Sequence, residues 1–109
     1  MPRYLFFPAV LFAAGIGAPV QAAAPAPAAL AKPAKLGLCA SCHGEDGRSR
    51  VAGTPHLAGQ DEAYLRKALT DFRTGARTAA PMNAIAGTLQ PKDIQALARW
   101  FATRPVRTQ

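Results

Sequence analysis

Large apolar side chains are scarce beyond residue 22, and this scarcity limits what the chain can fold into. Only 14 of the 87 residues from Ala23 to Gln109 are Leu, Ile, Val or Phe, about 16%. Chains below roughly 20% in these residues, with a high net charge, tend to be disordered. A domain of this size buries only about 60–65% of its unfolded surface even when apolar residues are plentiful. Either the chain is disordered, or another body supplies the missing apolar mass.

Residues 1–22 have the organisation of a secretory signal peptide. Arg3 precedes an apolar run from Leu5 to Ala18, and a small-residue site follows at Val20–Ala22. This order of basic start, apolar stretch and small-residue end is typical of cleaved export signals. The run is short for a membrane span, and one Pro and two Gly interrupt it. We expect a periplasmic protein, and the alternative is a membrane anchor formed by an uncleaved signal.

The exported part divides into a tether and a domain. Residues 23–33 are almost all Ala and Pro, which predicts an extended tether that cannot pack. Residues 34–109 are predicted to form one all-α domain, because no stretch alternates as a β-strand does. Start and stop signals such as Asp61, Gly75 and Pro91 predict helices over about 34–43, 61–74 and 91–103. The segments 44–59 and 75–89 are predicted to be loops, and long loops are often functional.

The two cysteines of the chain, Cys39 and Cys42, stand directly before His43. This C-x-x-C-H pattern is the signature of covalent c-type haem attachment. On a helix, positions i, i+3 and i+4 share one face, so both sulfurs and the imidazole would meet the same group. Two thioether bonds would fix one haem c while His43 binds its iron. A haem is also a large apolar body of the kind that the composition requires.

Other interpretations of the two cysteines fit less well. A thioredoxin-like pair needs a βαβ framework that the sequence does not predict. A disulfide between Cys39 and Cys42 would close too small a loop to stabilise so apolar-poor a chain. A zinc site would need a fourth ligand, for which His56 is the remaining histidine, and zinc would not fill a core.

The sixth position of a His43-bound iron needs a second ligand. Met82 is the one methionine beyond residue 22, and it lies in the second predicted loop. A lone methionine is usually a core filler, but a thioether opposite His43 would give the His/Met ligation of cytochromes c. The rival is His56, which lies only thirteen residues after His43 and reaches the opposite face less easily. We favour Met82.

From about Leu36 to Ala102 the chain resembles small bacterial class I cytochromes c. The resemblance rests on Cys39-Ala-Ser-Cys42-His43-Gly44, Asp46-Gly47, Pro55-His56-Leu57-Ala58-Gly59-Gln60, Tyr64-Leu65, Phe72-Arg73-x-Gly75, Met82-x-x-Ile85-x-x-x-Leu89 and Asp93-Ile94-x-x-Leu97-Ala98-x-Trp100-Phe101.

The resemblance implies a class I fold of three to four helices around one haem. It implies that the Pro55 carbonyl accepts a hydrogen bond from His43 and that Leu57 and Ile85 line the haem pocket. Trp100 would pack the last helix across the first near Gly37. Lys35 departs from the family, since many members have a bulky apolar residue one turn before the first cysteine.

These observations predict a monohaem electron carrier and not an enzyme, because His43 and Met82 would close both axial positions. The alternatives are a cytochrome subunit of a periplasmic dehydrogenase or oxidase complex, and a haem ligand-binding or peroxidase-like protein in which Met82 does not ligate. A net charge of +6 beyond residue 22 favours redox partners with acidic docking surfaces, such as periplasmic or membrane-bound respiratory components. Binding to nucleic acid is not expected of an exported haem protein, and we expect a monomer.

Overall fold

The computed structural model describes residues 1–3, 5, 8–10, 15, 17–24 and 29–107. Four helices follow one another: α1 (Leu36–His43), α2 (Glu62–Thr74), α3 (Met82–Gly87) and α4 (Pro91–Ala102). Within the ranges described there is no strand, as the all-α prediction requires. The predicted signal peptide falls partly on residues outside these ranges. Among the residues described, no helix has the length and apolar character needed to cross a membrane.

Helices α2 and α4 begin where their sequence signals predict. The Asp61 carboxylate accepts a hydrogen bond from the Tyr64 backbone N–H at 2.7 Å, which caps α2. Gly75 ends α2 with a φ of +83°, a conformation that favours glycine. Pro91 is the first residue of α4, and the Asp93 carboxylate accepts a backbone N–H in the first turn. Both helices therefore match their predicted ranges to within one residue.

Helix α3 differs from the prediction, which placed residues 75–89 in one loop. The helix has six residues and no side-chain cap at its N-terminus. An element of this length is too short to show an apolar period, so the pattern that reveals α2 and α4 is missing here. The consequence matters for the site, because Met82 is the first residue of this helix and not a loop residue.

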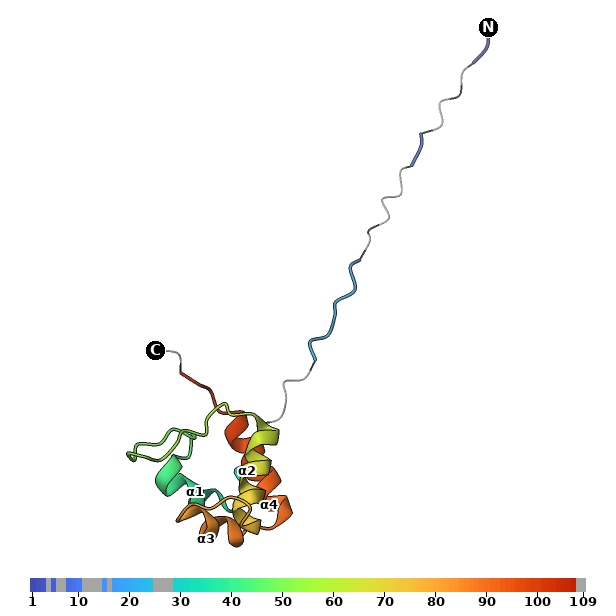
Figure 1. Ribbon diagram of the computed structural model, residues 1–109. Helices are drawn as coiled ribbons and strands as arrows, with labels where there is room; N and C mark the ends of the chain where they lie inside the picture. The colour runs from blue at the N-terminus through green and yellow to red at the C-terminus, as the bar shows by residue number, and fades with distance from the viewer. Residues whose placement is uncertain (4, 6–7, 11–14, 16, 25–28, 108–109) are drawn as a thin grey trace.

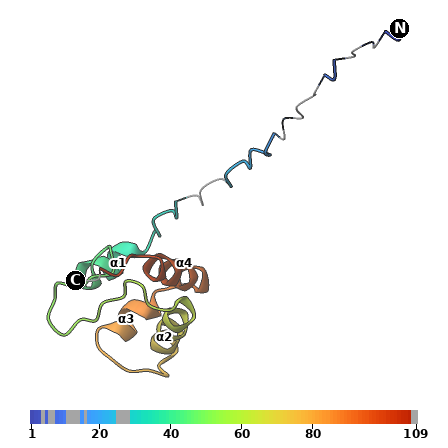
Figure 2. The ribbon, with the colours of Figure 1, turned by 90° about the horizontal axis from the view of Figure 1, so that it is seen from above.

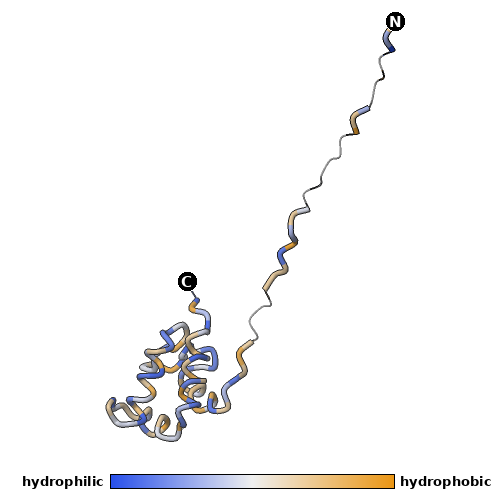
Figure 3. The backbone as a smooth tube through the Cα atoms, turned by 90° about the vertical axis from the view of Figure 1, so that its right-hand side faces the viewer, coloured by the Kyte–Doolittle hydropathy of each residue, from blue (hydrophilic) through white to orange (hydrophobic). Residues whose placement is uncertain are grey.

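Helix α4 contributes most of the buried residues and packs against α2, while α3 packs on α2 (Figures 1 and 2). Hydrophobic residues come in short stretches along the helical region and form no long apolar block (Figure 3). The buried cluster consists of Leu36, Cys39, Leu65, Leu89, Ile94, Leu97, Ala98, Trp100 and Phe101.

The end of the predicted tether lies on the domain. Leu30 packs against the buried cluster, and Lys32 forms an ion pair of 2.7 Å with Glu45. Both side chains of this pair are more than half exposed, so the ion pair adds little stability. The packing of Leu30 places the start of the folded region a few residues before the predicted boundary at 34.

The residue next to Gly37, and not Gly37 itself, contributes to the buried cluster from this part of the first helix. Gly37 is exposed, and a Cβ added there would meet nothing within 4 Å. Leu36, with 2% of its surface exposed, is the residue of α1 that joins the cluster containing Trp100. The Trp100 indole N–H also donates to the Glu45 carbonyl at 2.8 Å, just beyond the end of α1.

Candidate cofactor site

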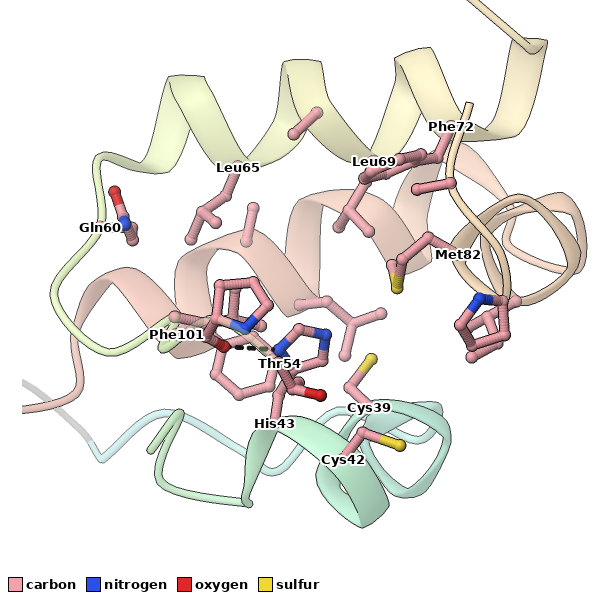
Figure 4. Close-up of a pocket in the computed structure, with 18 of the residues that line it drawn as sticks. Cys39, Cys42, His43, Thr54, Gln60, Leu65, Leu69, Phe72, Met82 and Phe101 are labelled. Carbon is pink, nitrogen blue, oxygen red and sulfur yellow. Dashed lines mark hydrogen bonds between the residues drawn. The ribbon is translucent and has the colours of Figure 1, made fainter. Parts of the chain in front are cut away.

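A cavity of about 370 Å³ lies between α1, α2, α3 and the loop around residues 53–57. Its lining is mostly apolar, and the helices α2 and α4 supply one wall (Figure 4). That wall includes Leu65, Leu69, Phe72, Leu97 and Phe101. A cavity of this size and character suits an apolar cofactor with a few convergent polar ligands.

His43 is the last residue of α1 and lies at the cavity with 7% of its surface exposed. Its Nδ1 lies 2.8 Å from the Pro55 carbonyl oxygen. Because a carbonyl can only accept, Nδ1 must carry the proton, and the lone pair of Nε2 is left for another partner. The loop residue Pro55 thus fixes both the orientation and the tautomer of His43.

Cys39 and Cys42 lie one turn apart on α1, and both line the same cavity as His43 (Figure 4). Neither forms a disulfide. Burial raises the pKa of the Cys39 thiol to about 11. Reactive redox cysteines have a lowered pKa, because the thiolate is the nucleophile. The environment of Cys39 is the opposite of that of a thioredoxin-like thiol.

His56 belongs to the loop that follows α1, and its ring is already engaged. Its Nδ1 accepts the backbone N–H of Ser49 at 2.9 Å. In the neutral ring, Nε2 then carries the proton and has no lone pair for a metal. The Ser49 hydroxyl also donates to the Cys42 carbonyl at 3.0 Å, which holds the loop against the end of α1. His56 therefore helps to shape the loop on the same side as His43.

Met82, at the start of α3, projects its sulfur into the cavity from across the site (Figure 4). The sulfur points towards the region between His43 and Cys39 (Figure 4). Ile85, one turn further along α3, lines the cavity on the same side, and Leu57 lines it from the loop of Pro55. The structure thus brings the seven residues expected to hold or surround the haem to one cavity: Cys39, Cys42, His43, Pro55, Leu57, Met82 and Ile85.

Asn83 is a residue of this region that sequence reasoning did not single out. Its side chain bonds the backbone at Phe72, Arg77 and Ala79, each at 2.8 Å. Asn83 directly follows Met82, but no spacing or motif in the sequence indicates its role. Its hydrogen-bond partners lie four to eleven residues away in the chain and are brought to it only by folding.

A family model described as cytochrome c matches residues 28–104. The chain therefore belongs to the cytochrome c family, which confirms the resemblance found in the motifs. It is 40% identical over 76 residues to a cytochrome c4 of Pseudomonas aeruginosa, a match over 70% of this chain and 38% of that protein. A thiosulfate dehydrogenase electron acceptor of Stutzerimonas stutzeri is 43% identical over 76 residues, or 69% of this chain and 35% of that protein.

A solved structure shows the same fold. The crystal structure of reduced recombinant cytochrome c4 from Pseudomonas stutzeri matches with a TM-score of 0.58 and 40% identity, over 62% of this chain and 38% of that chain. The all-α class I cytochrome c fold is thereby confirmed. The chain spans less than two fifths of the length of these three relatives.

The cavity and its donor groups fit one covalently bound haem c. Two unpaired cysteines one helical turn apart match the two thioether attachments. The neutral Nε2 of His43 matches an axial nitrogen ligand, and the apolar wall of α2 and α4 matches the faces of a porphyrin. A haem would also supply the apolar mass that the composition of the chain lacks, and the mostly apolar lining of this cavity suits it.

Proposed function

We propose that this protein is a periplasmic monohaem electron carrier. In this proposal haem c is attached through Cys39 and Cys42, and its iron is held by His43 and Met82. The observation that carries the proposal is that His43 and Met82 reach the same cavity from opposite sides (Figure 4). If both residues bind the iron, the protein would leave it no coordination site for a substrate. The function is then electron transfer and not catalysis.

A haem c in this cavity would supply a one-electron couple between ferric and ferrous iron. The chain supplies the ligands and their environment. Pro55 holds His43 in one tautomer, and the buried side chains of α2 and α4 exclude water. A thioether ligand in an apolar site favours the reduced state, which carries less charge, and so raises the reduction potential.

The engaged ring of His56 favours Met82 as the second ligand. His56 would have to give up its hydrogen bond with the Ser49 N–H or change its tautomer to expose a lone pair. It also belongs to the loop that orients His43, whereas Met82 comes from α3 on the other side. Met82 needs no such rearrangement.

The partner in this proposal is a redox protein with an acidic docking surface. Beyond residue 22 the chain has 12 basic and 6 acidic side chains, an excess that would steer it to an anionic face. The similarity to a thiosulfate dehydrogenase electron acceptor supports a periplasmic dehydrogenase as the donor. We further propose that residues 1–22 are a cleaved signal and that the carrier is a monomer.

The ligands are tested by ferric absorption spectra of the haem-loaded protein. Wild type should show a weak far-red band from sulfur bound to iron, and Met82→Ala should lose it. His56→Ala is the matched control for the rival ligand and should keep the band. A wild-type protein without the band, or a band that survives Met82→Ala, would contradict the proposal. A stable stoichiometric complex purified from the native cell would instead favour the subunit alternative over a free carrier.

A further inference from the structure

The segment that leads into Met82 is linked to α2 by the side chain of Asn83, among other contacts. We propose that Asn83 is the positioning residue that holds the Met82 thioether at the cavity and limits its release. The proposal rests on the ligation of iron by Met82 proposed above. Asn83 itself reaches no ligand; it acts through the backbone on either side of Met82.

The three hydrogen bonds of Asn83 fix the orientation of its amide. Its Nδ2 donates to the carbonyls of Phe72 and Arg77, and its Oδ1 accepts the backbone N–H of Ala79, all at 2.8 Å. Carbonyls can only accept and a backbone N–H can only donate, so the reversed amide would lose all three bonds. The arrangement uses both donor hydrogens and the acceptor of one primary amide.

The positions of the three bonded backbone groups explain why these hydrogen bonds, called the Asn83 clamp below, can control Met82. The Phe72 carbonyl is among the last four of α2, which have no partner within their own helix. Phe72 is buried, and its helix forms the cavity wall, so this anchor is rigid. The other two anchors lie in the segment 75–81 that precedes Met82. Asn83 thereby ties the chain before Met82 and the chain after it to one fixed helix.

A second contact supports the same segment. The guanidinium of Arg77 lies over the Phe72 ring at 4.6 Å from its centroid. The side chain of Arg77 and its carbonyl are thus both held at the C-terminal end of α2. Moving Met82 away from the cavity would displace this segment and so would break the hydrogen bonds of the Asn83 side chain.

Few side chains could replace Asn83. Aspartate has the same shape, but it would place a carboxylate oxygen against the two carbonyls in place of the donating NH₂. Alanine would lose all three bonds. Asn83→Asp keeps the size of the side chain and removes its N–H donors, so it tests the donor role alone. Asn83→Ala removes all three hydrogen bonds of the clamp.

The test uses the haem-loaded protein and two readouts of iron ligation. The first is the far-red sulfur-to-iron band of the ferric form, and the second is the rate at which cyanide displaces Met82. We expect both Asn83 variants to weaken the band and to bind cyanide about tenfold faster, the factor given by about 1.4 kcal/mol of lost hydrogen bonding. Met82→Ala sets the upper limit of the cyanide rate.

The matched control is Thr88→Ala, at the residue that directly follows the same short helix. The Thr88 hydroxyl donates to the Ile85 carbonyl at 2.7 Å, so this variant also loses a bond to the α3 backbone, but it leaves the clamp in place. It should keep the band and the wild-type cyanide rate. If Asn83→Asp matches wild type, or if Thr88→Ala accelerates cyanide binding equally, the inference is wrong. If wild type itself lacks the band, the proposed ligation has failed instead.

Discussion

Removing the haem attachment should unfold the domain, and the cavity volume shows why. In Cys39→Ala/Cys42→Ala no thioether bond can form, and the cavity of about 370 Å³ would lose its occupant. At about 24 cal/mol per Å³, an empty cavity of that volume costs up to ~9 kcal/mol. This is an upper limit, because water can enter. The predicted domain of residues 34–109 has 76 residues, and a domain of that size has a total stability of only about 4–11 kcal/mol.

The expected outcome is a degraded chain or one without cooperative structure, measured by far-UV circular dichroism and thermal melting. Ser41→Ala is the matched control, because Ser41 lies between the two cysteines, is exposed and leaves both sulfurs in place. It should take up haem and melt like wild type. Recovery of a helical, cooperatively melting double variant without haem would refute the argument that the polypeptide cannot close a core alone.

Three further predictions concern stability and docking. Gly47→Ala should lower the melting temperature more than Gly53→Ala. Both glycines have a φ of +76°, so an alanine is strained at either position. In addition, a Cβ at Gly47 would lie 2.6 Å from the Ala58 nitrogen, whereas a Cβ at Gly53 would meet nothing within 4 Å. We expect losses of at least ~2 and about 1 kcal/mol respectively, and equal losses would contradict the steric reason. Trp100→Phe should lose about 1 kcal/mol with its bond to the Glu45 carbonyl, whereas an unchanged denaturation midpoint would show that the bond adds nothing. Rising salt should slow oxidation by an anionic inorganic oxidant and speed it with a cationic one; equal responses would rule out steering by the net positive charge.

Much of the fold could be predicted because its signals are local. Asp61 and Gly75 mark the ends of α2 within a few residues of chain, and Pro91 does the same for the start of α4. Helix α3 lacks a capping side chain and spans fewer than two turns, so its stability comes from packing on α2. The exposed position of Gly37 also depends on how α1 and α4 meet, which no local pattern encodes.

In the candidate site, too, the residues with a local sequence signal could be predicted, and the residues whose partners are distant in the chain could not. Cys39, Cys42 and His43 can be read from a pentapeptide, because haem attachment requires their spacing on one helix face. The partners of Asn83 and Trp100 lie up to 11 and 55 residues away, and only the folded chain brings them together. Residues that bind a cofactor can be recognised by residue type and spacing. The roles of residues such as Asn83 and Trp100 depend on their neighbours in the folded chain, so residue type alone does not reveal them.

The scarcity of apolar residues and the architecture have one physical cause. Leu65, Leu97 and Phe101 belong to the buried cluster between α2 and α4, and the same three side chains also line the cavity. They are therefore shared between the protein core and the lining of the cavity, and dispersion contacts are lost wherever such a lining faces empty space or water. A haem placed against this wall would complete their packing. The core would thus be shared between polypeptide and cofactor, which would let a chain with only 14 large apolar residues beyond residue 22 fold.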